Sequence, residues 1–419
     1  MAMTALLEAK VRKVVMAGPV NRPALSSLKL DKRASKMLLK GGIKVFGDDG
    51  LLSVLIDEIE TDNGSKIGHI ILNSPETLNS LTLAMVEGIS KQLKYWEKRN
   101  SLKAVLIEGA GEKAFCAGGD IRALYDSMIE SPKKSMYAEE FFEKEYRLDY
   151  QIHKYPKPVI SILDGIVMGG GAGLMLGSHY RVCTERTRFA MPEIGVGLFP
   201  DVGFTFFINK LPEGLGKYMM LTATNLKAAD TQFCGLTNQY VDSSFLEDFY
   251  SKIKSIDWGD DIKSNQISIE NLLNEFNVPK NLNLLPQGML EERLDEVRSL
   301  TKGDDLQEVV GNILNNATDD EWFIAGRSGL ENGCPTSAHI IWEQCKRSNE
   351  LTLEEVFRFE LNLAIQITRR GDFSEGIRAV IIEKDNSPNW KFKTIAEVPR
   401  DWVQEHLEPA WKYNPLEDI

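Results

Sequence analysis

Polar and hydrophobic positions alternate in two short segments near residue 60 and then recur with wider spacing, which predicts strands followed by helices. Residues 51–59 and 67–72 are rich in β-branched side chains, and the turn sequence DNGS at 62–65 predicts a hairpin between them. From 82 to 98, apolar side chains recur as on one face of a helix. The same succession continues with a strand, a helix and a strand at residues 104–107, 139–154 and 159–163. Such repeated units predict α/β layers whose ligand-binding loops lie at the carboxyl ends of the strands.

The pattern changes along the 419 residues and divides the chain into four parts. We expect a basic leader, an α/β core, a mostly helical insertion or linker, and a helical C-terminal region that completes the fold, at residues 1–46, 47–242, 243–333 and 334–419. Within the last part, hydrophobic spacing predicts helices at 335–346 and 352–369. The β-branched run at 380–382 predicts a short strand.

Charge is distributed unevenly between the leader and the rest of the chain. Residues 1–46 contain ten lysines or arginines and two acidic residues, whereas the whole chain has a formal charge of −12. Basic, acid-poor beginnings are typical of mitochondrial transit peptides, and residues 2–15 have some amphipathic helical character. The alternative is a basic tail that the mature protein retains, which would be able to contact RNA. Because the remainder is strongly acidic, general nucleic-acid binding is not expected.

Cysteine, histidine and apolar residues exclude several other classes of protein. The five cysteines form no CxxC pair, which fits a reducing compartment such as the cytosol or the mitochondrial matrix. The five histidines form no HExxH or similar spacing, so we predict no metal site. No apolar run reaches the roughly 18 residues that a membrane span needs, so no membrane partner is expected.

Two glycine-rich loops contain the first candidate residues for chemistry. The sequences FCAGGD at 115–120 and MGGG at 168–171 each follow a predicted strand and precede a predicted helix. Glycine lets backbone N–H groups approach a ligand oxygen, and two such donors stabilise the negative charge that develops on a thioester carbonyl under attack. We predict that the amides of Gly119 and Gly170 are these donors; for either loop alone, a structural turn is the alternative. Neither loop has GxGxxG in register or a Walker lysine, which excludes dinucleotide and P-loop sites.

Three acidic residues in apolar surroundings are the second set of candidates. Glu193 and Asp201 flank the apolar stretch at 194–200, where burying an acid is costly. Such surroundings raise the pKa of a carboxyl group, which suits a general base or acid near neutral pH. For Asp201 the alternative is a helix cap, because it follows a proline at a plausible helix start. Glu145 interrupts the apolar face of the helix at 139–154, where it either pairs with a cation or binds a substrate hydroxyl.

Taken in order, these motifs resemble the crotonase (enoyl-CoA hydratase/isomerase) superfamily and, within it, the 3-hydroxyisobutyryl-CoA hydrolases of valine breakdown. The matching segments are KAFCAGGDI (113–121), FF and EY (141–146), DG and MGGG (164–171), AMPEIGVGLFPDVG (190–203), CPTS (334–337) and GDFSEGIRAVIIEKDNSPNW (371–390). The resemblance implies a crotonase-like spiral of repeated ββα units. It also implies that Gly119 and Gly170 form an oxyanion hole, that Glu193 activates water or itself attacks the thioester, and that Asp201 is the partner of Glu193. Glu145 matches a substrate-binding position.

One departure from the superfamily bears on the reaction. Hydratases of the superfamily have a second glutamate just after the triple glycine, where this chain has Gly173. Hydration needs an acid and a base placed together, so we predict hydrolysis of a short 3-hydroxyacyl-CoA thioester, with enoyl-CoA hydratase or isomerase activity as the less favoured alternative. Coenzyme A is part of that substrate, so no separate cofactor is expected. Lys113 is our candidate for contacting its phosphates, and an exposed lysine without that role is the alternative.

The resemblance also implies a place in the cell and possible partners. Valine breakdown and the basic leader point to the mitochondrial matrix, and trimers or their multiples are common in the superfamily, so a homo-oligomer is expected. A different class of function stays open, because relatives of this hydrolase are components of the small subunit of mitochondrial ribosomes. In that case the leader and residues 243–333 would contact ribosomal RNA or protein.

Overall fold

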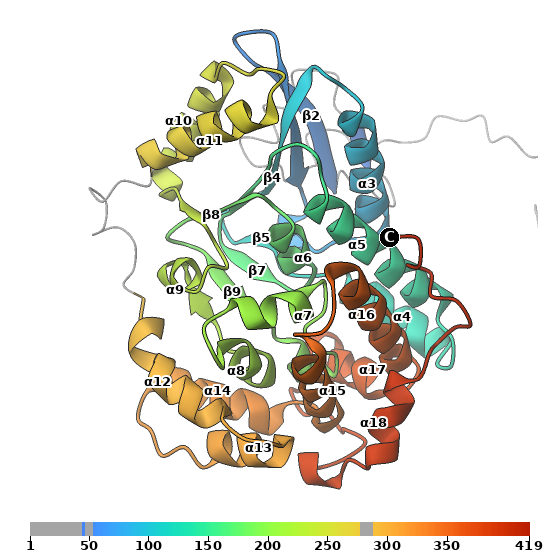
Figure 1. The fold of residues 1–419 in the computed structure, drawn as a ribbon. Helices are drawn as coiled ribbons and strands as arrows, with labels where there is room; N and C mark the ends of the chain where they lie inside the picture. Colours follow the sequence, from blue (N-terminus) through green and yellow to red (C-terminus); the bar gives the residue numbers. More distant parts are fainter. Residues whose placement is uncertain (1–43, 47–52, 277–287) are drawn as a thin grey trace, which may run out of the picture.

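The computed structural model describes residues 44–46, 53–276 and 288–419, and a seven-stranded sheet lies at its centre (Figure 1). The strand order is β1-β2-β3-β4-β6-β8-β11. The bounds are β1 (Lys44–Phe46), β2 (Val54–Glu60), β3 (Lys66–Leu72), β4 (Leu102–Gly109), β6 (Val159–Leu163), β8 (Tyr180–Cys183) and β11 (Gln239–Tyr240). The first three strands are antiparallel, and from β3 onward every pair is parallel. The predicted hairpin and the predicted strands at 67–72, 104–107 and 159–163 are confirmed, and the strand predicted at 51–59 is confirmed over its described part, from residue 54 onward.

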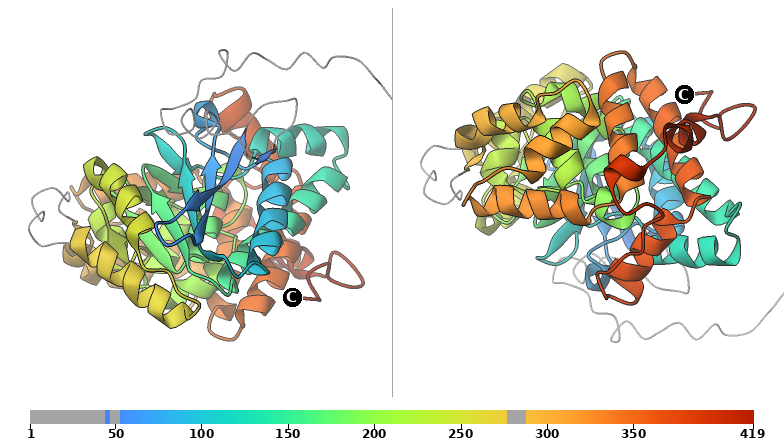
Figure 2. Two further views of the ribbon diagram at one scale, coloured as in Figure 1. Left: turned by 90° about the horizontal axis from the view of Figure 1, so that it is seen from above. Right: turned by 90° about the horizontal axis from the view of Figure 1, so that it is seen from below.

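Helices cover both faces of the central strands of this sheet, and alternate side chains of each strand point to opposite sides. On β4, Val105 and Ile107 contact the main core, which includes α3 (Leu83–Glu97) and α5 (Met136–His153). Ala104 and Leu106 point to the other face, which α10 (Leu246–Lys252) and α11 (Ile262–Phe276) cover. Seen from above, these two helices and α3 lie on opposite sides of the sheet (Figure 2, left).

A second, four-stranded sheet holds the ends of the glycine-rich loops. Its order is β10-β9-β7-β5, with β10 (Leu226–Lys227), β9 (Arg188–Ala190), β7 (Ile166–Met168) and β5 (Ala114–Cys116). β5 and β7 are parallel neighbours, so their carboxyl ends lie side by side. The loop after β5 leads into α4 (Ile121–Glu130), and the triple glycine after β7 opens α6 (Gly170–Leu176), as the sequence predicted.

Helix boundaries follow local capping signals. Thr82 accepts a hydrogen bond from the amide of Met85 at the start of α3, and Ser135 does the same for Ala138 at the start of α5. Thr352 and Glu355 form a capping box at the start of α16 (Leu353–Thr368). These signals explain why the predicted helices at 82–98, 139–154 and 352–369 are confirmed to within three residues.

The remaining helices surround the second sheet and complete the C-terminal region (Figure 2, right). They are α7 (Phe204–Phe207), α8 (Leu215–Thr222), α9 (Ala228–Phe233), α12 (Leu290–Thr301), α13 (Leu306–Leu314), α14 (Glu321–Asn332), α15 (Pro335–Arg347), α17 (Asp372–Ile377) and α18 (Arg400–Leu407). α16 packs against α5, and α14 packs against α8. Most of the predicted leader, and the predicted helical character at 2–15, lie outside the described residues.

The strand predicted at 380–382 is wrong. These residues belong to a π-helical turn, η9 (Arg378–Ile382), that continues α17. A Cβ atom on Gly376 would lie 2.2 Å from the carbonyl oxygen of Val196, so α17 is packed directly on the turn after β9. This tertiary contact, together with the ion pair between Arg378 and Glu375 three residues earlier, overrides the strand preference of a β-branched run.

Candidate active site

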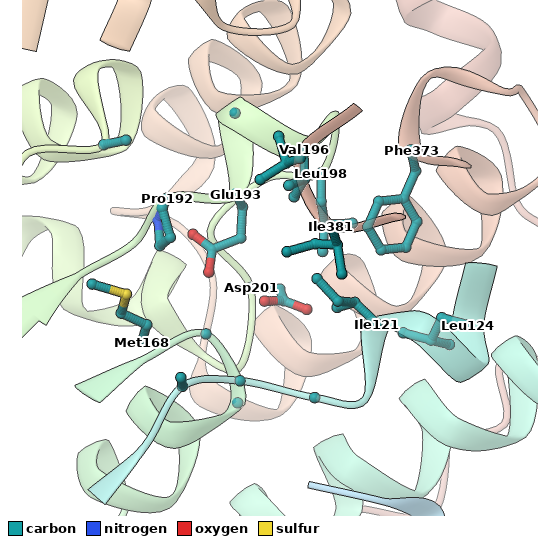
Figure 3. Close-up of a pocket in the computed structure, with 18 of the residues that line it drawn as sticks. Ile121, Leu124, Met168, Pro192, Glu193, Val196, Leu198, Asp201, Phe373 and Ile381 are labelled. Atoms are coloured by element: carbon teal, nitrogen blue, oxygen red, sulfur yellow. The ribbon is translucent and has the colours of Figure 1, made fainter. Parts of the chain in front are cut away.

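A cavity of about 530 Å³ lies where the carboxyl ends of β5 and β7 face the turn after β9 (Figure 3). Its lining includes Gly119, Gly170, Glu145, Glu193 and Asp201, so the structure brings five of the six residues singled out in the sequence to one place. The wall is otherwise largely apolar and contains no lysine, arginine or histidine from the described ranges. The cavity therefore combines carboxyl groups and backbone amides with apolar surroundings.

Lys113, the sixth candidate, lies apart from this cavity. Its side chain is exposed on the turn before β5, and its carbonyl oxygen accepts a hydrogen bond from the amide of Ile166. No cavity-lining atom comes from this residue. A contact between Lys113 and phosphates of coenzyme A stays a prediction.

The two glycine amides approach each other because β5 and β7 are paired. The amide nitrogen of Gly119 lies 3.4 Å from the point that a Cβ atom on Gly170 would occupy. The amide nitrogen of Gly170 lies 3.9 Å from the corresponding point on Gly118. Within the part of the chain that the structure describes, neither N–H group donates to a protein acceptor. Both donors are thus available to an oxygen atom in the cavity.

Side chains at these two positions would collide with the wall of the site. A Cβ atom on Gly119 would lie 2.8 Å from the ring of Phe141, and one on Gly170 would lie 2.3 Å from Oε1 of Glu145. Contacts this short force one of the partners to move. Glycine is therefore needed for the close approach of the loops to α5.

Glu193 begins the short 3-10 turn η4 (Glu193–Val196), which points its carboxyl group into the cavity. Figure 3 shows this group and the carboxyl group of Asp201 facing the same open space. Oε2 of Glu193 is buried and has no hydrogen-bond partner among the described residues. Burial, reinforced by the charge of Asp201, raises the pKa of Glu193 well above its usual range. Such a carboxyl group holds its proton more tightly than an exposed glutamate does.

Asp201 is held by a buried tyrosine. The hydroxyl of Tyr146 donates a hydrogen bond of 2.5 Å to Oδ2 of Asp201. Burial raises the pKa of Asp201 to about 7, while the hydrogen bond from Tyr146 acts in the opposite direction because it stabilises the ionised form. Asp201 thus titrates in the range where a general acid or base is effective.

The backbone just after Asp201 adopts an uncommon conformation. Val202 has a φ of 53°, a region that β-branched residues rarely occupy. Glu360 of α16 accepts hydrogen bonds from the amides of Gly203 at 2.6 Å and Thr205 at 3.0 Å. Gln344 of α15 donates to the carbonyl oxygen of Pro200 at 2.7 Å. Two buried side chains from the C-terminal helices therefore hold the strained turn that directs Asp201 into the cavity.

Glu145 points from α5 toward the triple glycine. It is 3% exposed, forms no ion pair within the described residues, and its Oε1 has no hydrogen-bond partner there. The cation pair considered as an alternative from the sequence is thus not formed. Burial, followed by the charge of Asp201, raises the pKa of Glu145 well above its usual range.

Several residues of the site carried no assigned role in the sequence analysis. Tyr146 was visible only as the neighbour of Glu145, and Glu360 is separated in the chain by 157 and 155 residues from the two amides that it binds. Asp149 had a usable signal, since it follows Glu145 by four residues on the same helical face. Helix α14 adds Ser328 and Asn332 to the cavity wall. Apart from the helical spacing of Asp149, no local pattern in the sequence indicates that these residues reach the site.

The described residues contain neither a cluster of metal-binding side chains nor a helix that could span a membrane. Among them, no group of three or more histidine, cysteine, aspartate or glutamate side chains has an arrangement that could hold a metal ion. The helices at 53–276 and 288–419 include none that is long and apolar enough to cross a membrane.

Comparison with known proteins shows which family this chain resembles. The model of the enoyl-CoA hydratase/isomerase family matches residues 67–407, and a model of the LpxI N-terminal domain matches residues 1–69. A relative from Danio rerio is 37% identical over 347 residues, which are 83% of this chain and 88% of the relative. A relative from Homo sapiens is 34% identical and covers 84% of this chain and 89% of its own. Both are named mitochondrial 3-hydroxyisobutyryl-CoA hydrolase.

Two solved structures are similar over almost their whole length. An enoyl-CoA hydratase from Rhodobacter sphaeroides 2.4.1 superposes with a TM-score of 0.74 at 28% identity, covering 85% of this chain and 98% of that one. A carnitinyl-CoA dehydratase from Mycobacterium thermoresistibile gives a TM-score of 0.76 at 31% identity, covering 88% and 99%. The chain therefore belongs to the enoyl-CoA hydratase/isomerase family and has the crotonase fold, which confirms the resemblance found in its motifs.

Proposed function

We propose that this protein hydrolyses the thioester bond of a short 3-hydroxyacyl-CoA, and that 3-hydroxyisobutyryl-CoA is its substrate. The observation that carries the proposal is the convergence of the unbonded Gly119 and Gly170 amides with the carboxyl group of Glu193 in one cavity. Membership of the crotonase family and relatives named as hydrolases support CoA thioester hydrolysis as the reaction.

In the proposed reaction, the thioester carbonyl oxygen accepts hydrogen bonds from the amides of Gly119 and Gly170. Ionised Glu193 takes a proton from a water molecule as the water oxygen attacks the carbonyl carbon. When the C–S bond breaks, the protonated Glu193 returns that proton to the departing thiolate, which leaves the acid and free coenzyme A. Loss of one amide donor of this kind typically lowers the rate by about 10²–10³.

In a second route, the carboxylate of Glu193 attacks the thioester carbonyl and expels the coenzyme A thiolate, which leaves a mixed anhydride. Water then cleaves the anhydride and supplies the proton that the thiolate takes up. Both routes use the same two amides, consume one water molecule and give the same products, the acid and free coenzyme A. A single turnover in heavy-oxygen water separates them, because hydrolysis of the anhydride at the Glu193 carbonyl leaves the label on the enzyme. Direct attack by water leaves the label in the released acid instead.

Glu145 and Asp201 have separate tasks in this scheme. Glu145 lies beside Gly170, where its carboxyl group meets the hydroxyl of the acyl chain. Asp201, held by Tyr146, raises the pKa of Glu193 so that Glu193 is a stronger base once ionised. No cofactor takes part apart from the coenzyme A of the substrate.

The experiment that tests this function measures free coenzyme A released from a set of short acyl-CoA thioesters by the purified protein. Glu193→Gln is expected to abolish turnover while the protein stays folded, because the amide cannot accept the proton of water. Glu140→Gln, an exposed position on α5, is the matched control and should behave as wild type. Near-full activity of Glu193→Gln would refute the assignment of the base.

We further propose the mitochondrial matrix as the location, since the relatives are named as mitochondrial proteins. The native mass tests the expected homo-oligomer. Sedimentation with the small ribosomal subunit, combined with no turnover of any acyl-CoA, would favour the ribosomal alternative over an enzyme.

A further inference from the structure

A second buried carboxyl group lies behind Glu145. Asp149 follows it by one turn of α5, is 0% exposed, and faces the same helix, α6. Its three carboxyl atoms lie 2.4, 2.6 and 2.7 Å from the point that a Cβ atom on Gly173 would occupy. The carboxyl group of Asp149 therefore fills the space that glycine at position 173 leaves free.

Glu145 and Asp149 lie on neighbouring turns of α5, and each has its carboxyl group against a glycine of α6. Glu145 lies against Gly170 and Asp149 lies against Gly173, and positions three apart on a helix are about 5–6 Å from each other. Both oxygens of Asp149 and Oε1 of Glu145 lack a hydrogen-bond partner within the described residues. Glu145 and Asp149 are four positions apart on α5, a spacing at which side chains are neighbours on one helical face. Ionising both of these buried acids together is strongly unfavourable, because within the described residues neither charge would be solvated or paired.

Among the described residues, the titratable groups that face Asp149 are three acids and a thiol. They are Glu145 on its own helix, Asp201 in the turn before α7, Glu360 on α16, and the thiol of Cys116 at the end of β5. Burial has the largest effect, and the first three acids add to it, so the pKa of Asp149 lies well above its usual range. Within the described part of the chain, no cation pairs with Glu145 or Asp149.

We propose that Asp149 is a positioning residue that acts through Glu145: the two carboxyl groups do not ionise together, so that Glu145 keeps its proton and meets the substrate without a negative charge. This inference rests on the proposed hydrolase function. Glu145 lies beside Gly170, one of the two amides offered to the oxyanion, and a charged Glu145 would repel the negative oxygen that forms there. Protonated Glu145 instead donates a hydrogen bond to the hydroxyl of the acyl chain.

The test compares the pH dependence of kcat/KM in wild type and Asp149→Asn. The variant has nearly the same shape but cannot ionise, so Glu145 then titrates without the charge of Asp149, with Asp201 left as its acidic neighbour, and loses its proton at lower pH. For a strongly interacting pair, the alkaline limb is expected to move down by about one pH unit or more. Asp126→Asn, an exposed position on α4, is the matched control and should leave the limb in place.

A purely structural role of Asp149 would lower kcat/KM equally at every pH, and that result would overturn the proposal. A second readout does not depend on turnover: infrared spectroscopy at neutral pH should detect a buried protonated carboxyl that weakens in Glu145→Gln and in Asp149→Asn, but not in Asp126→Asn. Absence of any such band would also overturn it. Should the wild type hydrolyse no acyl-CoA while the band behaves as expected, the hydrolase function fails and the protonated Glu145 beside Asp149 stands.

Discussion

Replacing Tyr146 with phenylalanine removes one hydroxyl group and leaves the aromatic ring in place, which isolates the hydrogen bond to Asp201. Both partners are buried, and the bond is 2.5 Å long. Hydrogen bonds to charged groups contribute about 1.5–3 kcal/mol, and one pKa unit corresponds to about 1.4 kcal/mol. Because the tyrosine stabilises ionised Asp201, its loss should raise the pKa of Asp201 by about 1–2 units.

This shift can be read directly from the pH profile of thioester hydrolysis. Starting from a pKa of about 7, the same increment of about 1–2 units would lower the ionised fraction of Asp201 at neutral pH by roughly 5- to 50-fold. We expect kcat/KM of Tyr146→Phe to fall by a similar factor at pH near 7 and to recover as the pH rises above the new pKa.

A matched control lies one turn further along α5. The hydroxyl of Tyr150 donates to Glu354 at 2.8 Å, away from the cavity, so Tyr150→Phe removes the same atom from the same helix. Its pH profile should match that of wild type. A Tyr146→Phe enzyme that is slower by the same factor at every pH would refute the reasoning, because the hydroxyl would then act through packing rather than through the charge of Asp201.

The remaining predictions concern stability and the glycine amides. Asp201 keeps its proton in the folded protein up to a pH of about 7, whereas the unfolded chain releases it near its ordinary pKa, so ionisation favours unfolding as the pH rises between these values. At pH 8, Asp201→Asn should therefore raise the urea midpoint of unfolding by an amount equivalent to a few kcal/mol, whereas at pH 4 the midpoint should stay nearly that of wild type. An equal change of the midpoint at both pH values would contradict this. The same variant should abolish turnover. Gly170→Ala should lower kcat by about 10²–10³, because its Cβ would displace Glu145 and the amide. Gly311→Ala, where a Cβ meets no atom within 4 Å, should retain full activity and a slightly higher melting temperature.

The parts of the site that could be predicted from the sequence are those encoded locally. A glycine run after a strand predicts a close backbone approach, and the parallel pairing of β5 and β7 then brings Gly119 and Gly170 together. An acid on an apolar helical face, such as Glu145, is also recognisable from spacing alone. For these positions, a short window of sequence contains the physical cause of the structure.

Other parts depend on contacts between distant segments, and no local pattern reports them. The turn at Val202 needs Glu360 and Gln344, which arrive from helices more than 130 residues later. Asp149 looks like an ordinary helical acid until α6 presents Gly173 to it. The β-branched run at 380–382 predicts a strand, but packing of α17 on the turn after β9 makes it helical.

The residues that line the cavity come from distant parts of the chain, and this affects when the cavity can form during protein synthesis. Residues near 119, 170, 193 and 201 leave the ribosome early, while the wall at 373–388 and the helices that hold the Asp201 turn are translated last. A nascent chain that ends before α16 contains every reactive group of the site but lacks the partner of the Gly203 amide. Under the proposed function, we expect such a chain to be inactive until the C-terminal helices have docked, because its acids are not yet held in the arrangement of the folded protein.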